Sequence, residues 1–176
     1  MFTPTIRIAI VLASLLFSIN DLQHGLTTRA YLSLCVMGIF IWGYFKSGTV
    51  YLAWTKIKQK DFDKAEKILD QTKYPKLLTK EQRGYFHFIK GLIYGNRNDL
   101  ENSYINLKEA LKFGVRTEND LAIINFHLSE IEFENGKVNE AKNFIQIARK
   151  LKFKEELEPM IKQMEDKINN ASQHYV

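Results

Sequence analysis

The chain has 176 residues and a formal net charge of +5, from 25 Lys and Arg against 20 Asp and Glu. The length suits one domain with an appendage, and so small an excess of charge does not indicate a nucleic-acid-binding protein. The single cysteine, Cys35, excludes an intramolecular disulfide and a cysteine metal site, and its apolar neighbours predict a buried thiol.

Two apolar runs without charge open the chain, at residues 8–19 and 30–45. Neither shows the polar face that a helix exposed to water usually keeps. Sixteen helical residues span about 24 Å against a hydrocarbon core of about 30 Å, which leaves a buried core helix as an alternative. Flanking apolar residues lengthen both runs, however, and aromatic residues between 42 and 54 bracket the second. We therefore predict a membrane hairpin over residues 1–45, with transmembrane helices at about 6–20 and 30–45 in contact with the lipid bilayer.

The basic residues near these runs predict an orientation. Four lysines between residues 46 and 60 follow the second run and Arg7 precedes the first, whereas the loop between holds Arg29 alone. By the positive-inside rule both termini lie in the cytoplasm. The expected localisation is thus integral to a membrane, a bacterial inner membrane, with the rest of the chain on the cytoplasmic side. A cleaved signal peptide is the alternative for the first run, although the residues after it lack the small-x-small cleavage pattern.

A sequence pattern that starts at residue 61 returns twice at a spacing of 38 residues. Its matching positions are Phe62, Leu100 and Val138, then Ala65, Ser103 and Ala141, then Leu69, Leu107 and Ile145. A fixed period of this size is typical of helical repeat arrays. Residues 79–82 form a capping-box sequence, and Asp61 and Asp99 are placed to cap helices. Each unit is therefore predicted to contain two antiparallel helices.

These positions resemble the tetratricopeptide repeat (TPR). In that family a small residue stands where the first helix of a unit crosses the second. That position is filled here by Ala53, Gly91 and Ser129. Tyr94 matches the family's usual aromatic residue, but Lys56 and Glu132 depart from it and each unit is four residues longer than usual. The resemblance covers residues 46–153.

The predicted fold class is therefore all-α. A TPR-like helical-hairpin solenoid of three repeats occupies residues 46–176, preceded by the two transmembrane helices. Apolar residues at helical spacing over residues 155–170 predict the terminal capping helix that a solenoid requires. Because no turn signal follows the second apolar run, we predict a continuous helix over about residues 30–60.

No residue pattern indicates a reaction. His127 and Glu130 lie three apart on one predicted helix, but no second pair of ligands accompanies them. No glycine-rich phosphate loop and no nucleophile with its base is present in the sequence. We expect no enzyme activity, catalytic residue, cofactor, metal, nucleic acid or small-molecule substrate.

The resemblance implies a membrane-anchored adaptor or scaffold that binds a protein partner in the concave groove of the array. The groove positions carried over from the family are Trp54, Tyr85, Phe88, Leu92, Phe126, Glu130 and Phe133. Family members that clamp a C-terminal carboxylate need asparagine and basic residues at several of these places. An apolar segment, with a basic residue for Glu130, is therefore the expected ligand. Three alternatives remain: the aromatic residues are covered by the C-terminal helix; the chain is a structural subunit of a larger membrane or cell-envelope complex without a groove; or the array lies outside the cytoplasm.

Overall fold

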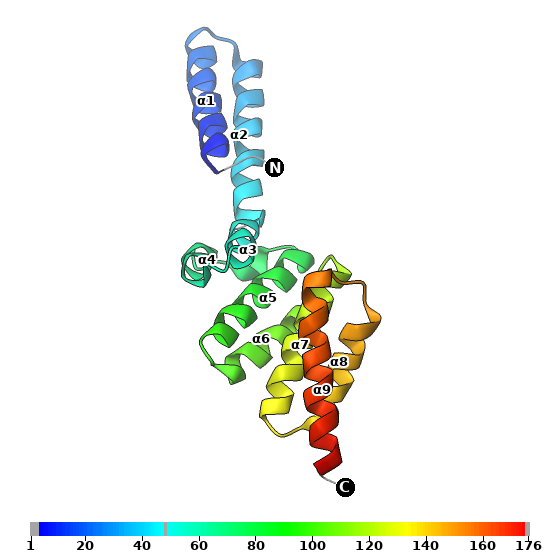
Figure 1. Ribbon diagram of the computed structural model, residues 1–176. Helices are drawn as coiled ribbons and strands as arrows, with labels where there is room; N and C mark the ends of the chain where they lie inside the picture. The colour runs from blue at the N-terminus through cyan, green and yellow to red at the C-terminus, as the bar shows by residue number, and fades with distance from the viewer. Residues whose placement is uncertain (1–3, 48, 175–176) are drawn as a thin grey trace. The chain divides into compact units, whose positions relative to one another are not determined.

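The computed structural model describes residues 4–47 and 49–174, and this part of the chain is helical and contains no strand (Figure 1). The chain divides into two compact units, Met1–Gly48 and Thr49–Val176. The all-α part of the predicted fold class therefore agrees with the structure.

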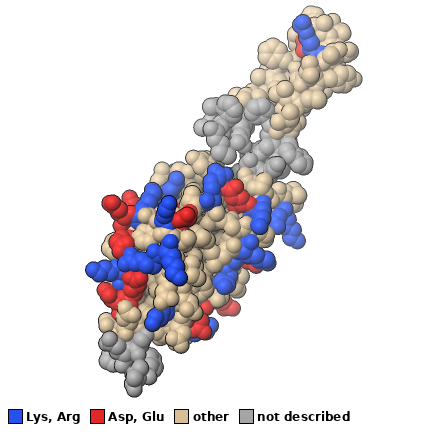
Figure 2. Space-filling model, turned by 90° about the vertical axis from the view of Figure 1, so that its right-hand side faces the viewer, with Lys and Arg blue, Asp and Glu red and all other residues tan. Residues whose placement is uncertain are grey.

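The first unit is a hairpin of two long helices. Helix α1 spans Pro4–Gln23 and helix α2 spans Thr27–Ser47. They approach closely at the buried residues Ser18 and Ala30, where the Ser18 hydroxyl donates to the Ala30 carbonyl at 3.4 Å. In the part of this hairpin that Figure 2 draws in colour, the charged side chains gather at its turn. Its exposed apolar side chains include Leu12, Leu16, Phe17, Tyr31, Leu32 and Ile39.

The structure overturns the membrane prediction. Among the residues that it describes, none of the helices is both long enough and apolar enough to pass through a membrane. The two transmembrane helices and the integral-membrane localisation predicted above are therefore wrong. The charge-free runs hold 12 and 16 residues, fewer than the roughly 20 that a span needs. The helices reach 20 and 21 residues only by including polar residues near the turn, such as Asp21, Gln23 and Arg29.

Two further predictions concern this unit. Cys35 was expected to be buried, and it is exposed. The continuous helix predicted over about residues 30–60 passes through residue 48, which lies outside the described residues. Helix α2 ends at Ser47 and the next helix begins at Val50.

The second unit is an array of three helical hairpins and a terminal helix. The first hairpin is α3 (Val50–Lys58) with α4 (Phe62–Leu69), followed by the 3-10 turn η1 (Pro75–Leu77). The second is α5 (Lys80–Asn96) with α6 (Leu100–Phe113), and the third is α7 (Glu118–Glu134) with α8 (Val138–Lys150). A second 3-10 turn, η2 (Glu155–Leu157), leads into α9 (Glu158–His174), which packs against α8 and α7 (Figure 1).

Local sequence signals start these helices as predicted. Thr79 and Gln82 form the expected capping box at the start of α5. Asp61 and Asp99 accept hydrogen bonds from the backbone at Lys64 and Asn102, at 3.2 Å each. These bonds satisfy amide groups that the first turn of a helix leaves without a partner.

All four hairpins turn in the same way. Each connection has three residues, and the middle one adopts a left-handed conformation: Gly25 (φ 72°), Lys60 (φ 58°), Asn98 (φ 60°) and Gly136 (φ 74°). In each turn the amide of the third residue donates to the carbonyl five residues earlier, at 2.8–3.0 Å. This is the bond that closes the C-terminus of a helix beyond a left-handed residue. The α1–α2 hairpin therefore shares the turn of the three repeats, although no sequence match had indicated it.

Each hairpin buries a pair of small residues, one on each helix and twelve positions apart in the sequence. The pairs are Ser18 with Ala30, Ala53 with Ala65, Gly91 with Ser103, and Ser129 with Ala141. Ser103 donates to the Gly91 carbonyl across the second hairpin, and Ser129 donates to the Ala141 carbonyl across the third, both at 2.8 Å. The serine that donates thus lies on the second helix of one hairpin and on the first helix of the next, at equivalent positions of the repeat.

Side chains between the hairpins hold the array together. The Trp54 ring on α3 lies 5.0 Å from the Phe88 ring and 6.0 Å from the Tyr85 ring on α5, between ring centroids. Arg97 pairs with Glu66 on α4 through both carboxylate oxygens. Arg149 on α8 pairs with two carboxylates of α9, Glu158 at 2.6 Å and Glu165 at 3.2 Å. The terminal helix is thus fixed over the last hairpin, where it covers apolar surface of the end repeat.

Candidate binding groove

A cavity of about 980 Å³ lies on the array. The first helices of the three hairpins, α3, α5 and α7, contribute to its lining, together with the turns that follow α3 and α5 and the start of α9. We call this cavity the groove.

The 38-residue period builds the groove. Trp54, Leu92 and Glu130 occupy the same position of successive repeats, and all three line it. The residues four positions later, Lys58, Asn96 and Glu134, line it as well. Residues four apart share one face of a helix. Each repeat therefore turns the same face of its first helix to the groove.

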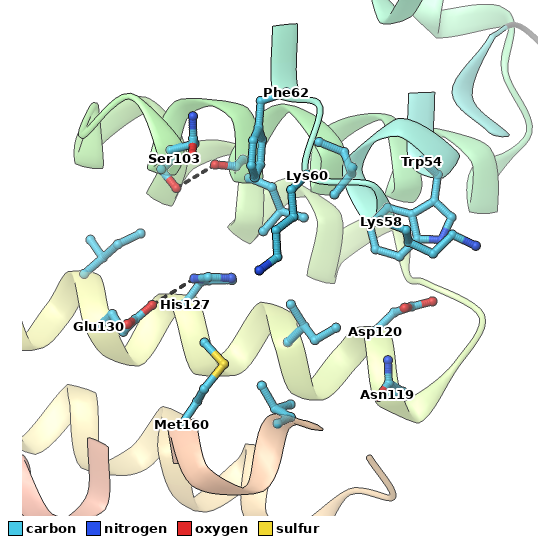
Figure 3. Close-up of a pocket in the computed structure, with 18 of the residues that line it drawn as sticks. Trp54, Lys58, Lys60, Phe62, Ser103, Asn119, Asp120, His127, Glu130 and Met160 are labelled. Atoms are coloured by element: carbon cyan, nitrogen blue, oxygen red, sulfur yellow. Dashed lines mark hydrogen bonds and ion pairs between the residues drawn. The ribbon is translucent and has the colours of Figure 1, made fainter. Parts of the chain in front are cut away.

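The groove combines apolar and charged side chains. Apolar side chains include Leu92, Ile123 and Met160, and the last of these is 43% exposed. Lys60, from the turn between α3 and α4, extends into the cavity toward His127 on α7 (Figure 3). A ligand in the groove would thus meet apolar contacts and charged groups together, as in most binding pockets of proteins.

A hydrogen bond joins His127 to Glu130 within α7. The Nδ1 atom of His127 lies 2.9 Å from Oε2 of Glu130. A carboxylate can only accept, so Nδ1 carries the hydrogen and donates. This bond engages one oxygen of Glu130 and fixes the orientation of the imidazole beside Lys60.

A second polar contact joins α5 to the start of α7. The Tyr85 hydroxyl donates to Oδ2 of the buried Asp120 at 2.6 Å, and the Arg116 amide donates to the same hydroxyl at 3.3 Å. Burial, followed by the hydrogen bond to the Asp120 carboxylate, raises the pKa of Tyr85 well above its usual range. Thr117 caps the same helix, because its hydroxyl accepts a hydrogen bond from the Asp120 amide at 3.0 Å. This contact fixes the position of the Asp120 side chain, which lines the groove.

The structure separates the predicted groove residues into two sets. Trp54, Leu92 and Glu130 line the groove. Phe88 is fully buried and Phe126 is 3% exposed, so neither side chain can reach a ligand. Phe126 packs among residues of α8 and α9, so it is covered by the C-terminal helix as the alternative reading expected, whereas Phe88 packs against α6 and α7.

The two remaining predicted residues, Tyr85 and Phe133, are half-buried against the core and do not line the groove. Partner binding by any of the seven residues stays a prediction.

The sequence analysis did not assign Lys58, Lys60, His127 or Met160 to the groove, although all four line it. The period could have identified Lys58. It lies four residues after Trp54, as Asn96 does after Leu92 and Glu134 after Glu130, and all three line the groove. Lys60 stands in the same register as Asn98, which also lines the groove, but the period does not show the direction of its side chain, which depends on the left-handed conformation of the turn.

Within residues 4–47 and 49–174, no group of three or more His, Cys, Asp or Glu side chains could hold a metal ion. No protein-family model, curated protein or solved structure matches this chain. The choice of a function therefore depends on the groove.

Proposed function

We propose that this chain is a TPR-like adaptor or scaffold that binds a segment of a protein partner in the groove of its helical array. One observation carries the proposal: each of the three repeats contributes its first helix, at the same two positions, to one cavity. A surface built in this way is extended across the hairpins, which is how solenoid proteins form binding surfaces.

The size and lining of the groove support a peptide ligand. Its volume of about 980 Å³ is at the upper end of the range of roughly 300–1,000 Å³ for pockets that bury a ligand. Leu92, Ile123 and Met160 keep part of their apolar surface exposed within it. Apolar surface in a concave site contributes to binding when a ligand covers it, so a short helix or an extended segment with apolar side chains fits.

A selection from a random peptide library displayed on phage tests the proposal, with the full chain immobilised as bait. Affinities of enriched peptides are then measured by fluorescence anisotropy. Met160→Glu places a charge in the groove on a side chain that is 43% exposed, so the fold tolerates it. We expect it to weaken binding about tenfold or more.

Ile147→Glu on α8 is the matched control, because Ile147 is 45% exposed and lies outside the groove lining. It should leave the affinity unchanged. A library that yields no binder, or binders indifferent to Met160→Glu, would refute the proposal.

A structural subunit of a larger protein assembly is the second candidate, favoured by the exposed apolar side chains of the α1–α2 hairpin. Exposed apolar surface of this extent usually marks contact with another molecule. In that case a stoichiometric partner would co-purify with the full chain and be lost on replacing Leu16 and Leu32 with serine, but not on replacing Met160 with glutamate.

A further inference from the structure

We propose that the groove selects partner segments that carry an aspartate or glutamate side chain, and that Lys60 is the residue that binds it. This inference rests on the proposed function, because it names the chemistry of the segment that the groove would bind. The occupant is an internal acidic residue flanked by apolar residues. Three observations support it: the backbone at Lys60, the unpaired charges of the groove, and the apolar side chains around them.

The backbone conformation at Lys60 favours a different residue. Lys60 has φ 58° at the middle position of its turn, where the other three hairpins have Gly25, Asn98 and Gly136. Glycine adopts this left-handed conformation without strain and asparagine tolerates it, whereas a side chain such as lysine is disfavoured there. Stability of the turn alone therefore favours glycine or asparagine at residue 60. A role for the side chain in the groove accounts for the lysine.

The charges that line the groove leave Lys60 without an anion. No ion pair joins Lys58, Lys60 or Lys154 to any carboxylate in the described part of the chain, in contrast to the paired Arg97 and Arg149. Of the four carboxylates in the lining, Asp120 accepts from the Tyr85 hydroxyl and Glu130 accepts from His127, while Glu134 and Glu156 form no ion pair with these lysines in the described residues. A carboxylate supplied by a ligand would give Lys60 the partner that the protein itself does not provide.

The surroundings of Lys60 restrict what else the ligand contains. Its side chain extends into the cavity between the wall formed by α3 and its turn and the helix α7 (Figure 3). Leu92 and Ile123 lie in the same cavity, so residues on either side of the acidic one would contact apolar side chains. An acidic residue within an apolar segment matches both features, and partial removal of water strengthens the ion pair.

The test uses the full chain and the same displayed library. Peptides enriched on the wild-type chain should share an aspartate or glutamate at one position. Replacing that residue with asparagine or glutamine in a synthetic peptide should weaken its binding about tenfold or more. Amidation of the peptide's C-terminus should leave the affinity unchanged, because the bound carboxylate belongs to a side chain. Loss of binding on amidation would overturn the assignment to a side chain.

Variants of residue 60 separate binding from folding. Lys60→Gly should raise the melting temperature by about 2–4 °C, because glycine suits the left-handed turn, and yet weaken the acidic peptide about tenfold. Lys60→Gln, which keeps a long side chain at the position, should weaken the binding of the acidic peptide by the same factor. The peptide in which asparagine or glutamine replaces the acidic residue should bind the wild type and both variants with equal affinity. Lys67→Gln removes the same charge from an exposed site outside the groove and should change neither affinity.

The outcomes distinguish the two proposals. A selection that enriches no peptide refutes the proposed function, and the inference with it. Enriched peptides without a shared acidic residue, or acidic peptides that bind both Lys60 variants as well as the wild type, overturn the inference alone.

Discussion

Gly84→Ala is expected to destabilise the array, although alanine favours a helix more than glycine does. Gly84 is a buried residue of α5, and a Cβ atom built there would lie 1.9 Å from the carbonyl oxygen of Gly114, just beyond α6. The carbonyl carbon would be 2.9 Å away. Because both atoms belong to the backbone, no side-chain rotation can relieve the overlap. Helix α5 and the end of α6 must move apart.

The magnitude follows from two opposing terms. Overpacking a well-packed core costs about 1–3 kcal/mol. The separation would loosen the contacts among Phe88, Leu107 and Ala110, which are fully buried around α5 and α6. The exchange of glycine for alanine inside a helix returns about 0.5–1 kcal/mol. With mid-range values of both terms, the net loss in the free energy of unfolding is about 1–2 kcal/mol.

Urea denaturation followed by far-ultraviolet circular dichroism measures this loss. With a slope of about 2 kcal/mol/M, the midpoint of the Gly84→Ala variant should fall by about 0.5–1 M. Gly38→Ala on α2 is the control, because no atom lies within 4 Å of the added Cβ and only the helix-propensity gain applies. A midpoint for Gly84→Ala equal to or above that of the wild type would show that the two elements do not approach as closely as the structure has them.

Three smaller changes test other contacts. Tyr85→Phe should reduce the loss of stability above about pH 10 in thermal unfolding. The folded-state pKa of Tyr85 lies above the unfolded one, so its contribution is complete below about pH 10 and is lost as the pH rises further; equal losses in both proteins would contradict this. Ser129→Ala should cost about 1 kcal/mol by urea denaturation, since it removes the bond to the Ala141 carbonyl, and an unchanged midpoint would argue against that bond. Thr79→Ala should cost about 1 kcal/mol through loss of the helix cap, whereas Thr79→Ser should keep most of the stability.

Features that depend on neighbouring residues could be predicted from the sequence. A helix start depends on the residues within one turn of it, so the capping box at Thr79 and the caps at Asp61 and Asp99 were predicted correctly. The resemblance to the tetratricopeptide repeat implied a small residue at one place in each first helix, and in the structure Gly91 and Ser129 take part there in a hydrogen bond between paired helices. The groove positions carried over from that family along the 38-residue register included Trp54, Leu92 and Glu130, which line the groove in the structure.

Tertiary packing decided the rest. Phe88 and Phe126 follow the helical pattern of groove residues, but their burial depends on how adjacent hairpins and α9 stack, which no local pattern records. The apolar composition of α1 and α2 favoured a membrane hairpin. Whether a helix can cross a membrane depends also on its length and on the polar residues within it, and neither helix meets both conditions over the described residues. Lys60 shows the limit most clearly. Its charge is visible in the sequence, but its side chain lines the groove only because α5 and α7 pack around the turn that holds it, and the residues near Lys60 do not record that packing.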